Sequence, residues 1–95
     1  MLEAVKTVLR ISHNRLDADV IRNIATARME LIRAGVSDVM ANSQDDELIN
    51  DAIITYCQAK YASNEKLQEG YFTSWQYQLD NLRKSEGYKA VTVDV

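Results

Sequence analysis

Apolar residues recur at helical spacing from Leu2 to Leu82, and no proline interrupts them. Spacings of three and four residues place such side chains on one face of an α-helix. The chain of 95 residues also has only three glycines, which is too few for a fold built from many tight turns. These features predict an all-α domain.

Helix start and stop signals divide this pattern into four segments. We expect a short docking helix over residues 2–11 and longer helices over residues 17–34, 44–63 and 71–85. Gly35 follows the second helix as a stop, and Gly70 is expected to break the chain before the last helix. The predicted architecture is a small bundle of three main helices plus the short N-terminal helix.

The C-terminal residues follow a different period. Valines at every second position alternate with Thr92 and Asp94, and this two-residue period is typical of a strand. No other segment has a strand pattern, so we expect no partner for it within its own chain. We therefore divide the chain into a helical domain, residues 1–87, and an extended tail, residues 88–95. Unpaired strand groups can be completed by another molecule, and a frayed terminus is the alternative. The predicted partner-binding residues are Tyr88, Ala90, Val91, Val93 and Val95.

Overall charge excludes several function classes. The net charge is −3 and the pI is about 5.0, so the chain lacks the basic footprint of a DNA-binding domain. No apolar run of about 18 residues is present to span a membrane, and no signal peptide opens the chain. The single cysteine, Cys57, cannot form an internal disulfide, and a reducing cytoplasm is the default compartment.

Candidate chemistry is sparse. His13 is the only histidine and lies in a polar loop, while Cys57 lies on the apolar face of the third helix. A zinc site needs several such ligands, and the carboxylates near residue 45 lack the calcium-loop pattern. We predict no catalytic residue, no cofactor and no metal site. Arg28, at the edge of an apolar stripe, is expected to pair with a carboxylate such as Asp51.

The order and spacing of four segments resemble small phage head–tail connector proteins. The first two are Val8-Leu9-Arg10-Ile11 with Leu16-Asp17-x-Asp19, and Ala27-x-x-x-Leu31-x-x-x-Gly35-Val36. The others are Asp46-x-Leu48-Ile49-x-x-Ala52-Ile53-x-x-Tyr56 and Tyr71-x-x-x-Trp75-x-x-x-Leu79-x-x-Leu82-x-x-Ser85-x-x-Tyr88. Together they cover roughly residues 2–88.

The resemblance implies a structural protein and not an enzyme. It implies a ring beneath the portal, twelve-fold to match it, that continues the DNA tunnel and provides a platform for the stopper or tail. The expected partners are the portal protein, a stopper or tail-completion protein, and other copies of the chain. DNA would pass through without sequence-specific binding, and no membrane would be involved. The protein would be assembled in the host cytoplasm and would reside in the virion at the head–tail interface.

Opposite charges within the chain suit such a ring. The N-terminal part is basic and the start of the third helix is acidic, so the two could pair between subunits, or the acid could face the DNA. The predicted ring-interface or lumen residues are Arg10, Arg15, Asp45, Asp46, Glu47 and Asp51.

Two other functions compete with this interpretation. The first is a small helical regulatory or interaction module, such as an anti-repressor or antitoxin, which would bind one soluble partner without forming a ring. The second is a chorismate-mutase-like enzyme, because Ile21, Ile24, Arg28 and Leu31 faintly resemble that family's first helix. The downstream lysine and second arginine of that family are not evident here.

Overall fold

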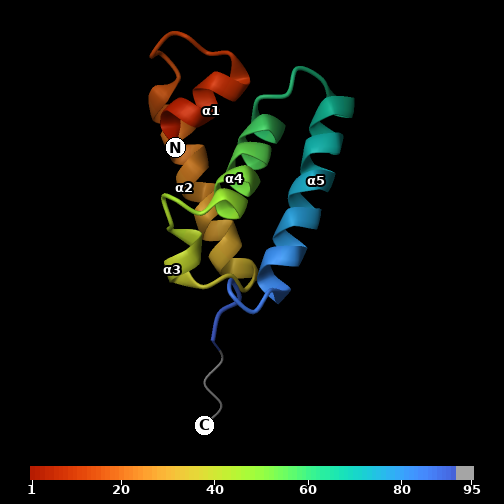
Figure 1. Ribbon diagram of the computed structural model, residues 1–95. Coiled ribbons are helices and arrows are strands. Elements are labelled where there is room, and N and C mark those ends of the chain that lie inside the picture. Colours follow the sequence, from red (N-terminus) through yellow and green to blue (C-terminus); the bar gives the residue numbers. More distant parts are fainter. Residues whose placement is uncertain (92–95) are drawn as a thin grey trace.

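Helices account for every regular element in the computed structural model, which describes residues 1–91 (Figure 1). They are α1 (Leu2–Leu9), α2 (Asp17–Ala34), α3 (Asp38–Ala41), α4 (Glu47–Lys60) and α5 (Glu65–Lys84). The predicted all-α bundle is confirmed over this range. The one-turn helix α3 was not predicted and lies in the connector between α2 and α4.

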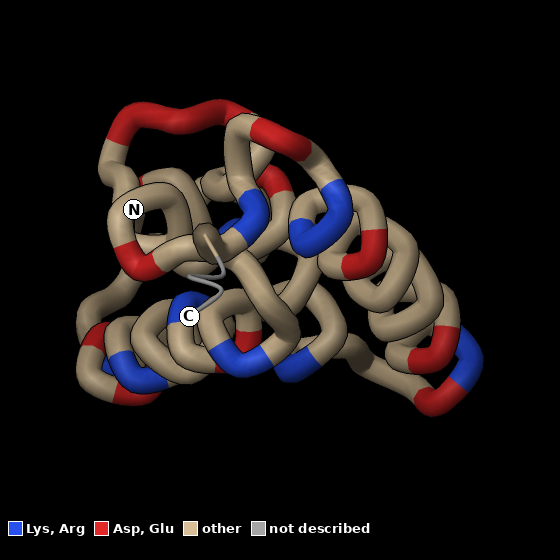
Figure 2. The backbone as a smooth tube through the Cα atoms, turned by 90° about the horizontal axis from the view of Figure 1, so that it is seen from below, with Lys and Arg blue, Asp and Glu red and all other residues tan. Residues whose placement is uncertain are grey.

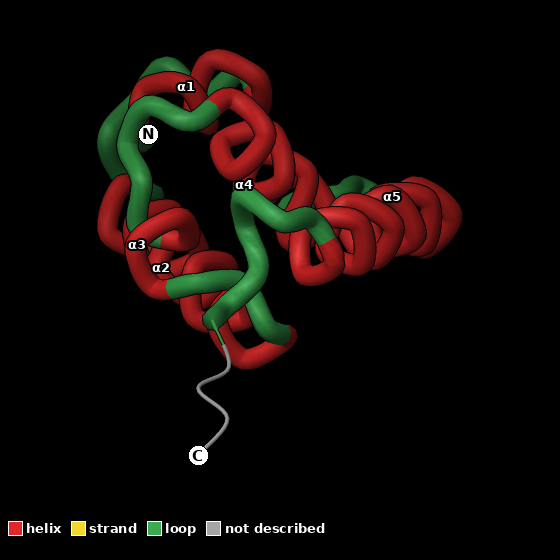
Figure 3. Tube along the Cα trace, turned by 60° about the horizontal axis from the view of Figure 1, so that its bottom comes forward, coloured by secondary structure: helices red, strands yellow, loops and turns green. Residues whose placement is uncertain are grey.

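The central helix of the bundle is α4. It packs against α5 on one side and α2 on the other, and α1 covers parts of both α2 and α4 (Figure 3). This arrangement leaves the outer face of α5 open along one edge of the molecule. Among residues 1–91, no helix has the length and apolar character needed to cross a bilayer.

The predicted apolar stripes form the core. The largest buried contributions come from α2 and α4, and Trp75 of α5 closes the core against Tyr56 with ring centroids 5.0 Å apart. The buried core residues of these three helices are Val20, Ile24, Ala27, Leu31, Ile49, Ala52, Ile53, Tyr56, Cys57, Ala59, Trp75 and Leu82. Burial of this apolar surface is the main force that holds the helices together.

Several helix boundaries differ from the sequence prediction, and α4 spans residues 47–60 where 44–63 was expected. The α5 helix begins at Glu65, six residues before the predicted start, and runs through Gly70 without a break. Asn64 caps it by accepting a hydrogen bond from the Leu67 amide at 2.9 Å. At the other end of the chain, α1 stops at Leu9 because Arg10 adopts a left-handed conformation with φ 59°.

Candidate partner-binding surfaces

The root of the C-terminal tail is attached to its own chain. An isolated antiparallel bridge joins Val36 to Lys89. The Ser37 amide donates to the Tyr88 carbonyl at 2.8 Å, and the Ala90 amide donates to the Gly35 carbonyl at 2.7 Å. The expectation that the tail has no partner within its own chain is therefore wrong for residues 88–90, because the connector after α2 is extended enough to pair with them.

A side-chain contact reinforces this attachment. The Tyr88 hydroxyl donates to the Asp46 carboxylate, with oxygen–oxygen distances of 2.9 and 3.2 Å. The same carboxylate caps α4 by accepting from the Ile49 amide at 3.0 Å. The hydrogen bond to Asp46 raises the pKa of Tyr88, and burial and the negative charge of the carboxylate act in the same direction. One carboxylate thus links the tail root to the start of α4.

Gly35 makes this arrangement possible at the end of α2. It is the C-cap of that helix with φ 119°, a left-handed conformation that side chains disfavour. The chain reverses there and presents its extended connector to the tail root. Gly35 therefore does more than stop the helix, which is the role that the sequence predicted.

Of the predicted partner-binding residues beyond Tyr88, the structure describes Ala90 and Val91, and both side chains are on the surface. Ala90 is exposed, and the Val91 side chain is 87% exposed. Tyr88 is half-buried against the core. Val93 and Val95 lie outside the described residues. The surface that a partner could contact therefore begins at the outer side of residues 89–91.

The predicted charged candidates are at the surface and are not engaged with one another. Arg10 and Arg15 are exposed in the α1–α2 segment, and none of the six candidates takes part in an ion pair within residues 1–91. The acidic residues at the start of α4 form an unbroken stretch along the chain, visible at the upper left of Figure 2. Of the four acidic candidates, Asp46 is half-buried, and the exposed ones are Asp45, Glu47 and Asp51.

Arg28 does not pair with Asp51. Its guanidinium is buried and donates to two backbone carbonyls, Ala41 at 2.8 Å and Ser43 at 2.9 Å. Burial lowers the pKa of Arg28. The prediction of a carboxylate partner is wrong, because carbonyls at the end of α3 already satisfy this cation. Arg28 thereby fixes the connector that leads to Asp46, and it is not free to hold a substrate carboxylate.

The other two residues considered for catalysis or metal binding are Cys57 and His13. Cys57 is fully buried, and this burial raises the pKa of its thiol to about 11, as expected of an unreactive core cysteine. His13 is exposed and its Nδ1 accepts from the Arg15 amide at 3.2 Å. Across residues 1–91 no group of three or more His, Cys, Asp or Glu side chains is placed to hold a metal ion.

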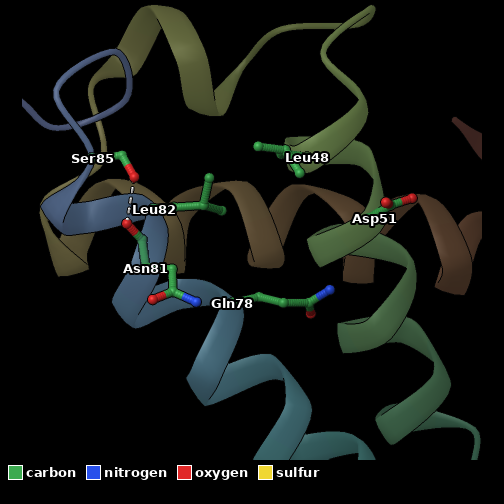
Figure 4. Close-up of a pocket in the computed structure, with 6 residues that line it drawn as sticks. All are labelled: Leu48, Asp51, Gln78, Asn81, Leu82 and Ser85. Carbon is green, nitrogen blue, oxygen red and sulfur yellow. Dashed lines mark hydrogen bonds between the residues drawn. The ribbon is translucent and has the colours of Figure 1, made fainter.

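The structure has a cleft between α4 and α5 that was not predicted from the sequence. Leu48 and Asp51 of α4, with Gln78 and Leu82 of α5, line an opening of about 240 Å³ (Figure 4). Gln78 lines this cleft from α5. Its spacing from Trp75 and Leu82, three and four residues away, does place it beside the buried stripe, and that was the available signal.

The family of the chain is shown by its sequence as a whole. A family model described as "Phage connector protein" matches residues 1–85. The chain belongs to this family. No curated protein matches the chain, and no solved structure does. The family match spans all five helices of this phage connector protein and stops before the tail root at Tyr88.

Membership in the family assigns a coarse role. A phage connector protein acts in the virion at the junction of head and tail, and the family is structural. The resemblance found in the sequence is thereby confirmed at the level of the family.

Proposed function

We propose that this protein forms a ring beneath the portal, continues the DNA channel there, and provides the docking platform for a stopper or tail protein. The observation that carries the proposal is the family match over residues 1–85. Two features of the described chain support it. These are an exposed Val91 beyond a fixed tail root, and exposed charges of both signs that form no ion pair within residues 1–91.

The fixed root gives the tail a defined direction of exit. Backbone pairing with residues 35–37 holds Tyr88 and Ala90, so the chain leaves the bundle at one end (Figure 1). We propose that this end faces the portal and that Val91 is the first residue to contact it. A partner strand could add to the tail through backbone hydrogen bonds.

Electron microscopy of the full chain mixed with the cognate portal protein tests the proposal. A ring stacked coaxially on the portal is the expected result, and native mass spectrometry would give its subunit number. Val91→Asp should weaken portal binding without changing subunit stability, because Val91 makes no core contact. Leu67→Asp is the matched control, since Leu67 is 47% exposed at the start of α5, at the end of the bundle away from the tail (Figure 1). A chain that stays monomeric beside its portal would contradict the proposal.

A further inference from the structure

The α4–α5 cleft contains hydrogen-bond acceptors that receive no donor from residues 1–91. The Oε1 atom of Gln78 is buried and has no hydrogen-bond partner within residues 1–91. Figure 4 shows this side chain reaching from α5 toward α4. Asp51 on the opposite wall is exposed and forms no ion pair within the same range. Buried acceptors are normally satisfied, so Gln78 Oε1 lacks a donor within residues 1–91.

The apolar part of the cleft suits the stem of a long side chain. Leu82 forms its floor and is buried, while Leu48 stands at its rim with 55% of its surface exposed. An occupant with a methylene stem and several N–H donors would cover the leucines and reach both Gln78 and Asp51. Arginine has these properties, and its planar guanidinium can donate to two acceptors at once.

Arg10 presents such a side chain at the other end of the molecule. It is the C-cap of α1 and, among residues 1–91, the only residue other than glycine with a positive φ. Glycine is usual at such a position because a side chain there is strained. A strained residue often marks a functional position. Arg10 is exposed, and no carboxylate within the described chain pairs with it.

We propose that Arg10 of one subunit inserts into the α4–α5 cleft of the next subunit. Its guanidinium donates to Gln78 Oε1 and to the Asp51 carboxylate, and its stem packs on Leu48. The α1–α2 segment and the cleft lie at opposite ends of the bundle (Figure 1), so each copy can donate and accept at the same time. Contacts between two different faces are heterologous and build rings when they close. This inference rests on the proposed function and names its subunit contact.

Charge-reversal variants of the full chain test the pairing of Arg10 with Asp51. Sedimentation velocity, with the cognate portal added if the ring needs it, would measure assembly. Arg10→Asp and Asp51→Arg should each weaken association at least tenfold, and the double variant should recover most of that loss. Lys66→Asp is the control, because Lys66 is an exposed cation that lies outside the cleft. Wild-type assembly by Arg10→Asp would overturn the inference while leaving the ring proposal intact.

A second variant separates the contact from folding. Gln78→Met removes the orphan acceptor and keeps the length of the side chain, so the thermal midpoint of the subunit should stay the same or rise. Association should nevertheless weaken several-fold. Unchanged association would count against insertion into this cleft. If the wild-type chain never assembles, with or without portal, the proposed function and this inference both fail.

Discussion

At the scale of residues, one side chain adds to the backbone hydrogen bonds that hold the tail root. The Tyr88 hydroxyl is the only side-chain group in residues 88–91 with a hydrogen bond to the helical body, through Asp46. Tyr88→Phe removes that bond and keeps the ring, so we expect a loss of about 1 kcal/mol in the free energy of unfolding. Urea denaturation would measure it. Tyr77→Phe is the control, because Tyr77 is 72% exposed, and equal losses in the two variants would contradict this role for Tyr88.

Tyr61 is expected to make stability depend on alkaline pH. It donates to Asp19 and accepts from Asn23 at 3.1 Å, and burial followed by the Asp19 hydrogen bond raises its pKa to about 12. An ordinary tyrosine has a pKa of about 10. A raised folded-state pKa means that this contribution is complete below pH 10 and is lost as the pH rises toward 12.

Tyr61→Phe therefore tests the alkaline dependence. The difference in free energy of unfolding between wild type and variant should shrink as the pH rises from 10 to 12. Cys57, with a pKa raised to about 11, titrates in both proteins, and in the wild type its charge adds to the raised pKa of Tyr61. Urea denaturation across this pH range is the measurement. A difference that stays constant would show that the Tyr61 hydroxyl has no raised pKa.

At the scale of elements, Gly70 is a weak point in α5. It is helical and exposed, its φ is not positive, and a Cβ added there would meet no atom within 4 Å. Glycine within a helix costs about 1 kcal/mol relative to alanine. Gly70→Ala should therefore stabilise the subunit by about that amount, which a rise in thermal midpoint would show. A lower midpoint would mean that this position needs the freedom of glycine.

The same position shows where sequence reasoning reaches its limit. The α2 helix was predicted with its observed bounds because Asp17 and Gly35 mark its ends. Gly70 was predicted to break a helix, but its cost is small beside the burial of Trp75 and the packing of Phe72 against the core. Tertiary packing overrides local propensity in such cases.

The site was less predictable than the helices. The tail root pairs with Val36, a single residue in a connector, and one bridge has no two-residue period for a sequence to reveal. Arg28 binds backbone carbonyls, and every residue type carries such a group. Of the six charged candidates, five are exposed, and Asp46 is half-buried and held by the α4 cap and by Tyr88. Their roles depend on partners outside the single chain.

At the scale of the whole molecule, exposed acidic side chains bear on the passage of DNA. Asp45 and Glu47 are exposed and stay separate from the cap and tail contacts that occupy Asp46. If the ring places them in the channel, their charge repels the phosphate backbone and keeps the duplex from binding the wall. Asp45→Asn combined with Glu47→Gln should then slow genome ejection from assembled particles.

Ejection kinetics read by a DNA-binding dye would measure this effect, and lower ionic strength should enlarge it because salt screens exposed charges. Glu65→Gln combined with Glu69→Gln is the matched control, since both residues are exposed on α5 far along the chain from the acidic stretch. Neutralising either pair changes the net charge of the subunit equally. Equal ejection rates in the two variants would therefore place the acidic start of α4 outside the channel, on the face that meets a neighbouring subunit or the tail.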